Sequence, residues 1–245
     1  MPSPHARDAG DARRYARRTV ALTLVLYAIL AAALLGRLSP WVFVVVLPLL
    51  YVRLSLALHE LMHLRTAAQV SWFHALAMIF DTPLGLGYRE HRAIHLRHHR
   101  HAGTVRDPEL FQIEGGHLRA LGCALVSPEY AAWRWVRERG LSRDLLWQAG
   151  VRGALFACLV ALNPPVFAAY WATLRVCIGG ASFVFHHLMH NRDGALGTFA
   201  FPGVPRRAVA IAQLAFGREP VTIVREHRAH HRDPNVRARD LARAA

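Results

Sequence analysis

Long apolar runs alternate along this chain with basic segments that are rich in histidine. The first run covers residues 20–35, and after a turn at 36–40 a second run covers residues 41–58. Each run is close to the length that an α-helix needs to cross the hydrocarbon core of a membrane. The pattern therefore predicts a first helical hairpin over residues 19–58, with both helices spanning the membrane.

A second pair of apolar runs predicts another hairpin, over residues 151–187. The chain turns between these runs at residues 163–165, and the later run carries Arg175. An arginine at mid-bilayer depth costs roughly 2.5 to 3.5 kcal/mol on insertion scales. We therefore expect either that these are shallow half-spans or that Arg175 has a partner. Between the hairpins, the moderately apolar stretch 67–86 is expected to lie at the membrane interface.

The distribution of charged residues predicts the orientation of the spans in the membrane. All 30 basic residues are arginine, against 16 acidic residues, and they gather in residues 1–18, in the central segment and in the tail, whereas the two short turns carry only Arg37. Arginine is enriched in cytoplasmic loops. We therefore expect an all-α integral membrane protein of the bacterial inner (cytoplasmic) membrane, with about four transmembrane helices. Residues 1–245 would form a single domain, in which the basic N-terminal arm and a helical cap lie in the cytoplasm. Arginines placed between apolar runs favour anionic lipid or an acidic partner over nucleic acid.

Eleven of the 16 histidines fall into four short groups. The groups are His59-Glu-Leu-Met-His63, His95-Leu-Arg-His98-His99, His186-His187-Leu-Met-His190 and His227-Arg-Ala-His230-His231. Residues three and four apart share a helix face, so each group is expected to aim its imidazoles at one point. Two spans before the first group and two more before the third would place all four groups on one side of the membrane. So many imidazoles exceed the coordination sphere of one ion and predict two, although imidazole does not name the metal.

Other readings of these residues stay open at this point. The sequence His59-Glu60-Leu-Met-His63 also matches the HExxH motif of zinc metalloproteases, which would leave both HxxHH groups unexplained. Glu60 with His63 and Glu114 with His117 match the ExxH motif of soluble carboxylate di-iron bundles, but two glycines make the second match a poor helix. A non-catalytic haem or metal carrier would use only a few of the histidines.

The order of the groups resembles that of the membrane fatty acid desaturase and hydroxylase superfamily, whose signature is HxxxH, a first HxxHH and a late HxxHH. The segment from His95 to Leu110 is similar to the second box of bacterial carotenoid ketolases, and the spacing of the first two boxes is similar to that of desaturases. After the last box, His231-Arg-Asp-Pro-Asn235 departs from the apolar residue and proline that are usual in relatives, which affects the substrate more than the metal.

The resemblance implies a membrane-bound di-iron enzyme that uses dioxygen to oxidise a lipid. Its iron ligands would be His59, His63, His95, His98, His99, His190, His227, His230 and His231, with His190 preferred to its neighbours His187 and His186. Desaturation of a fatty acyl chain is the first expectation, and hydroxylation or ketolation of a carotenoid or another lipid is the alternative. No CxxC set or flavin fingerprint is present, so we expect an external electron donor such as ferredoxin with its reductase.

The remaining candidates are expected to have lesser roles. Metal-bound imidazoles need partners for their second ring nitrogen, which favours Glu60 and Asp107 for that task. His5 and His117 are expected to be solvated, His74 to be an interfacial side chain, and His91 and His101 to be neighbours of the centre or surface residues.

Overall fold

The structure is a computed structural model that describes residues 9–64, 84–201 and 203–244. The expected interfacial stretch 67–86 lies mostly outside these residues, as do His5 and His74. The described part is helical apart from one short hairpin of strands and the connecting loops. This confirms the all-α class.

Among the described residues, four helices are long and apolar enough to cross a membrane, in agreement with the predicted number of about four spans. They are α1 (Ala9–Leu34), α2 (Val42–Met62), α8 (Arg143–Leu162) and α9 (Pro164–Ser182), the last continued by the π-helix η2 (Phe183–Leu188). Helix α1 already begins at Ala9, so the second half of the basic arm belongs to the first helix. Helix α8 likewise begins ahead of the predicted start at residue 151.

Local caps explain the bounds of the second hairpin. The side chain of Ser142 accepts a hydrogen bond from the backbone N–H of Leu145 at 3.1 Å, which starts α8 before its apolar run. At the turn, Asn163 accepts from the N–H of Val166 at 3.2 Å, and the prolines that follow it occupy the first turn of α9, where no N–H is needed.

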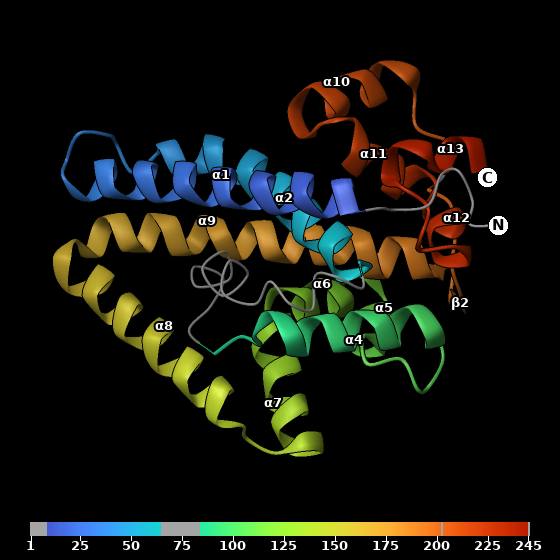
Figure 1. Cartoon of the computed structure of the whole chain (residues 1–245), viewed down its shortest axis with the longest axis horizontal. Helices are drawn as coiled ribbons and strands as arrows, with labels where there is room; N and C mark the ends of the chain where they lie inside the picture. Colours follow the sequence, from blue (N-terminus) through green and yellow to red (C-terminus); the bar gives the residue numbers. More distant parts are fainter. Residues whose placement is uncertain (1–8, 65–83, 202, 245) are drawn as a thin grey trace.

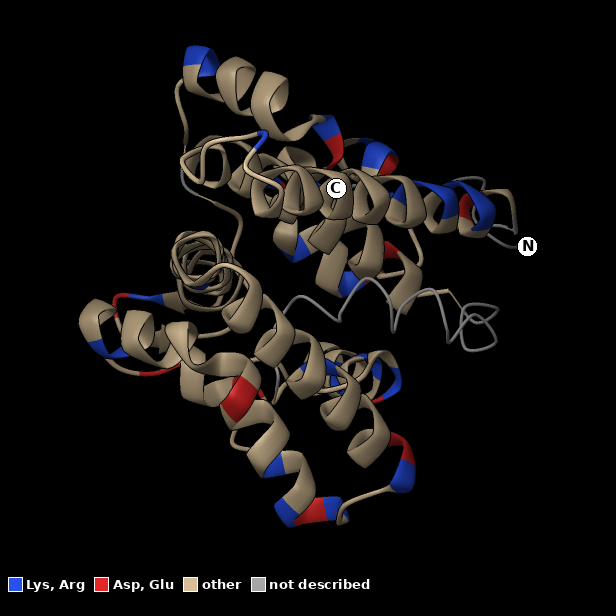
Figure 2. Cartoon of the chain, turned by 90° about the vertical axis from the view of Figure 1, so that its left-hand side faces the viewer, with Lys and Arg blue, Asp and Glu red and all other residues tan. Residues whose placement is uncertain are grey.

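The apolar core joins both hairpins. Helices α1, α2 and α9 run side by side along the long axis, whereas α8 diverges from α9 (Figure 1). Buried residues of all four helices form one cluster, in which the rings of Phe43 on α2 and Tyr170 on α9 meet edge to face at 5.5 Å. The burial of this apolar surface fixes α9 against the first hairpin. Long stretches of the helices carry no charged residue (Figure 2).

Shorter elements surround one end of these spans. They are α4 (Tyr88–His101), α5 (Leu110–Ile113), α6 (His117–Leu125), α7 (Ser127–Arg139), β1 (Asn191–Arg192), β2 (Ala195–Leu196), α10 (Arg206–Phe216), α11 (Arg218–Arg225), α12 (His227–Arg232), η3 (Ala238–Asp240) and α13 (Leu241–Ala244). Ion pairs tie the start of α1 to the C-terminal part: Arg14 and Arg18 both contact Glu219, at 2.5 and 2.9 Å. Arg237 contacts Asp11 at 2.8 Å. The basic N-terminal segment therefore packs onto the cap.

Arg175 has the partner that its position in a span requires. Its guanidinium binds both carboxylate oxygens of Glu129 on α7 and donates to the carbonyl oxygen of Leu125 at 3.1 Å. It also lies 4.1 Å from the ring centroid of Trp171. The side chains of Arg175 and Glu129 are 19% and 28% exposed. The expected partner is thus present, and it links α9 to the cap.

Removal of the Glu129 charge should destabilise the protein, because it leaves Arg175 without its counter-charge. For Glu129→Gln we expect a loss of about 1 to 2 kcal/mol in the free energy of unfolding, less than the 3 to 5 kcal/mol of a fully buried pair because both groups are partly exposed. Denaturant titration in detergent micelles measures it. Adding Arg175→Met should recover most of the loss. Wild-type stability in Glu129→Gln alone would contradict this role of the pair.

Candidate metal centre

Nine histidines from four parts of the chain converge at the end of the spans. One group holds His59, His63, His95, His99 and His230, and the adjacent group holds His98, His190, His227 and His231. All nine residues that the sequence predicts as ligands are therefore brought together. Within each core set, His59, His63, His99 and His230 in one and His98, His190 and His231 in the other, the possible ligand atoms lie within 4.8 Å of one another.

The HxxHH groups do not each aim at one point, as we expected; each divides its side chains between the two groups. On α4, His95 and His99 are four apart and share a face, whereas His98 lies in the other group. Adjacent residues of an α-helix differ by about 100° in direction, so His98 and His99 must diverge. Helix α12 divides its histidines in the same way, with His230 in the first group. Two helices thus each serve two sites.

The nitrogen atoms meet at distances suited to a shared cation. The Nε2 atoms of His63 and His95 are 2.9 Å apart, and the Nε2 atom of His190 lies 3.2 Å from that of His98 and 2.9 Å from that of His227. His230 is completely buried, and within the described residues neither of its ring nitrogens has a hydrogen-bond partner. Buried polar atoms are rarely left unpaired. The donor set therefore fits metal ions at both groups.

Buried carboxylate and carbonyl oxygens orient the rings of the second group. The Nδ1 atom of His98 lies 3.0 Å from both oxygens of the fully buried Asp107, to which it donates. Asp107 also accepts from the backbone N–H groups of Gly103 and Glu109, at 2.9 and 2.8 Å. Although burial alone raises the pKa of the Asp107 carboxyl, these hydrogen bonds lower it overall. The charged carboxylate thus fixes the His98 tautomer and leaves Nε2 for a metal.

A tight approach of two loops positions His190. The Nδ1 atom of His190 donates to the carbonyl oxygen of Gly197 at 2.7 Å, across the hairpin of β1 and β2. Gly103 has φ +72°, and a Cβ atom there would lie 2.8 Å from the backbone nitrogen of Gly197. Only glycine combines ready access to a positive φ with the absence of a Cβ atom. The loop that supports His98 is thereby packed onto the loop that supports His190.

Burial keeps the imidazoles neutral, which is the form that binds metals. Burial, helped by the neighbouring histidines, lowers the pKa of His190 to about 3. The same causes hold the pKa values of His95, His227, His230 and His231 well below the ordinary value. A neutral imidazole offers one lone pair.

The other two histidines of the third group belong to neither of the two metal groups. His187 lies buried between the carbonyl oxygen of Ile113 and the ring of His117, each at 2.8 Å. His186 donates from Nδ1 to the carbonyl oxygen of Ser182 at 3.2 Å. The preference for His190 thus agrees with the geometry. His117, expected to be solvated, is exposed but pairs with His187.

The two ExxH matches differ in what they contact. Glu60 is completely buried, and its carboxylate lies 3.3 Å from Nδ1 of His59, as expected of a group that orients a ligand. Glu114 instead pairs with Arg119 at 2.9 Å, at the surface. The second match therefore does not reach the centre, and a carboxylate di-iron bundle is excluded.

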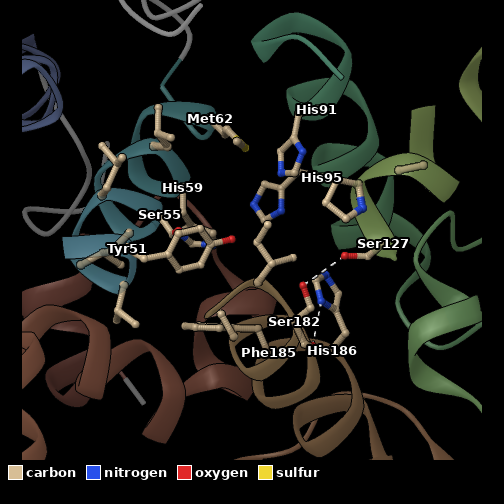
Figure 3. Close-up of a pocket in the computed structure, with 18 of the residues that line it drawn as sticks. Tyr51, Ser55, His59, Met62, His91, His95, Ser127, Ser182, Phe185 and His186 are labelled. Carbon is tan, nitrogen blue, oxygen red and sulfur yellow. Dashed lines mark hydrogen bonds between the residues drawn. The ribbon is translucent and has the colours of Figure 1, made fainter. Parts of the chain in front are cut away.

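A cavity of about 240 Å³ connects the histidines to the spans. Leucines of α1 and α2, with Tyr170, Leu174 and Ile178 of α9, line its membrane end. Its other end is bordered by histidines of both groups and by His91 (Figure 3). His91 was expected to neighbour the centre, and it lies in the cavity wall. Sequence reasoning gave no role to Glu109 and Gln112 in that wall, although Glu109 lies within the segment that resembles the second box.

Comparisons with known proteins give one match. A model of a family described as fatty acid desaturase matches residues 37–174, more than half of the chain. Searches of curated proteins and of solved structures gave no match. The matched region contains the first two histidine groups and ends before His190 and the last box. The structure itself joins the later histidines to the earlier ones.

Replacement of His190 should remove metal, whereas replacement of His187 should not. His190→Ala takes one imidazole from the second group, so we expect about half of the bound metal to be lost, as one of two ions would be. His187→Ala breaks hydrogen bonds outside the groups and should keep the metal, with some loss of stability. Elemental analysis of both purified variants decides between them. Full metal content in His190→Ala, with loss in His187→Ala, would show that the ligand is misassigned.

Acidification should destabilise the metal-free protein. The pKa of histidine is about 6.5 in an unfolded chain, but about 3 for His190 in the native state. Between these values the unfolded state binds more protons, so stability present above about pH 6.5 is lost as the pH falls. Each such histidine contributes about 1.4 kcal/mol per pH unit. Melting curves of chelator-treated protein from neutral to mildly acidic pH measure this, and a flat profile would be inconsistent with neutral buried imidazoles.

Proposed function

Because this chain belongs to the fatty acid desaturase family, we propose that it is a di-iron, dioxygen-dependent lipid oxidoreductase of the bacterial inner membrane. We further propose that it desaturates fatty acyl chains and that its histidine centre faces the cytoplasm. The observation that carries the proposal is the apolar cavity that extends from the membrane spans to both histidine groups. Such a cavity holds a lipid chain where a metal can act on it.

The histidines suit iron that must react with dioxygen. Nine imidazoles, which coordinate as neutral donors, would leave the positive charge of two ions largely uncancelled, and Asp107 and Glu60 orient rings from outside the ligand set. Bound iron would supply the activation of dioxygen that the cleavage of an unactivated C–H bond requires. The protein residues hold this chemistry away from water, since His98, His190, His227 and His230 are all buried.

Desaturation and hydroxylation share this site and differ in their products. Desaturation removes two hydrogen atoms from the lipid, and dioxygen accepts these together with two donor electrons and two protons to form two water molecules. Hydroxylation leaves one oxygen atom in the lipid instead. Placement of the chain relative to the metals decides between them. Hydroxylation or ketolation of a carotenoid or another lipid is therefore kept as the alternative, supported by the ketolase-like segment that begins at His95.

The electrons would come from a separate protein. The formal net charge of +14 would attract an acidic donor such as a ferredoxin, itself reduced by its reductase. The positive-inside pattern supports an approach from the cytoplasm, because the segments that surround the histidine groups are rich in arginine.

The zinc protease alternative explains less of the structure. A zinc site would use His59, His63 and one further ligand, with Glu60 as the base. Glu60 instead contacts the ring nitrogen of His59, and the second group of four histidines would have no role.

Metal analysis tests the proposal directly. We expect about two iron ions per chain in protein purified from its host, because the ligand count exceeds one coordination sphere. His98→Ala and His230→Ala should each lose iron, one from each group. Glu60→Gln should keep most of it, because the amide can still contact His59. One zinc ion per chain and no iron would exclude the oxidoreductase.

Product analysis identifies the reaction. Expression in a lipid-profiled host with ferredoxin and its reductase, followed by mass spectrometry of acyl chains and pigments, should show new double bonds that are absent with His98→Ala. New hydroxyl or keto groups would favour the alternative.

A further inference from the structure

The cavity beside the metal centre has two unlike ends. Its membrane end is formed mainly by apolar side chains, among them Leu22, Leu26, Leu47 and Leu174. Beside the metals, its wall carries His91, Glu109, Gln112 and His186, with Ser127 and Ser182 next to them. Figure 3 shows His91 on α4 and His186 on the continuation of α9 on opposite sides of this space. A saturated hydrocarbon tail cannot form hydrogen bonds with these side chains.

Hydrogen-bonding capacity in this wall is left for a ligand. Gln112 is 2% exposed and Glu109 is 8% exposed. The amide nitrogen of Gln112 donates to the carboxyl of Glu109, and within the described residues its amide oxygen has no partner. Whichever way the amide is turned, one of its two polar atoms is unused. Burial raises the pKa of the Glu109 carboxyl above its ordinary value.

The polar wall lies directly beside the metal ligands. The carboxyl of Glu109 is 3.8 Å from Nε2 of His186, and the ring centroid of His186 is 5.6 Å from that of His98. A group bound to Glu109 and Gln112 is therefore separated from the centre by only a few carbon–carbon bonds.

We propose that Glu109 and Gln112 bind the oxygen-bearing end of the lipid substrate, a hydroxyl or a carbonyl, while its apolar tail extends between α1, α2 and α9. The substrate is then oxidised a few bonds from its polar end and not in the middle of its chain. The position of oxidation rests on the proposed function, whereas the binding of the polar group does not.

A binding measurement separates the two claims. Tritiated hexadecan-1-ol and hexadecane are bound to the purified full chain, immobilised on scintillation-proximity beads in detergent, without added electron donor. Wild type should bind the alcohol about tenfold more tightly than the alkane, as expected for one well-formed hydrogen bond in a buried site. Gln112→Leu should reduce that ratio towards unity and keep the affinity for the alkane, which also shows that the variant is folded.

Matched variants make each outcome decisive. Gln213→Leu makes the same change on α10, outside the cavity, and should keep the wild-type ratio. Glu109→Gln preserves the side-chain volume and serves as the second variant if Gln112→Leu fails to bind either probe. A wild-type ratio in both cavity variants, or no preference in wild type, would overturn the proposal.

Turnover then tests the position of oxidation. With iron, ferredoxin and reductase present, mass spectrometry should place the modification of hexadecan-1-ol within the first several carbons. Mid-chain products would refute the placement. Loss of turnover in Glu109→Gln with an unchanged binding ratio would assign the carboxyl to proton transfer instead of binding. If the ratio of alcohol to alkane affinity falls towards unity in the cavity variants but the wild type shows no turnover, the binding site is upheld and the proposed function is contradicted.

Discussion

The structure depends on one constraint: many uncharged imidazoles are buried together at the end of the membrane spans. A buried polar nitrogen without a partner costs on the order of 1 to 3 kcal/mol. The completely buried ring of His230 has no hydrogen-bond partner within the described residues. A metal cation can accept several lone pairs that point to one place, so the binding of metal ions at these groups would stabilise the fold. The surrounding elements can be understood as the means of bringing these rings to two points.

Helix ends and buried hydrogen bonds determine where the histidine rings of the two groups converge. His59 and His63 end a long span, and His98 and Asp107 form a buried pair on either side of a sharp turn. The approach of Gly103 to Gly197 locks that turn against the loop that holds His190. A ligand placed by a helix end and a second hydrogen bond has little freedom, which is what a site with defined chemistry requires. The ion pair of Arg175 and Glu129 holds α9, the span that leads to His190, against the cap.

The sequence predicts most of this site, for physical reasons. Apolar length determines the four spans, and the helical spacing of the histidine groups, together with the family resemblance, identifies all nine converging rings. Helix phase alone implies that His98 and His99 diverge, but the histidines that each of them joins could not be predicted from the sequence, because they depend on where α12 packs. Nor could it predict Glu109 and Gln112, since isolated polar residues gain a role only when tertiary contacts place them in a cavity. Helix starts were missed where a cap such as Ser142 lies outside the apolar run.

In the proposed function, the residues that would bind the polar end of the lipid are distinct from the histidines that would hold the metals. The nine histidines would determine where oxidation occurs, and their positions depend on helix phase and on Asp107. The wall depends on α5 and on the turns of α9 near Ser182, which contribute no ligand. A polar group that binds at this wall would exchange its water hydrogen bonds for those of Glu109 and Gln112, whereas an apolar group there would leave the amide oxygen of Gln112 without a partner among the described residues. Discrimination against the apolar group is therefore stronger than the attraction of the polar one, as is general where a site is built to hydrogen-bond its substrate. If the proposed function holds, changes at Glu109 and Gln112 would alter the substrate while leaving the nine histidines in place.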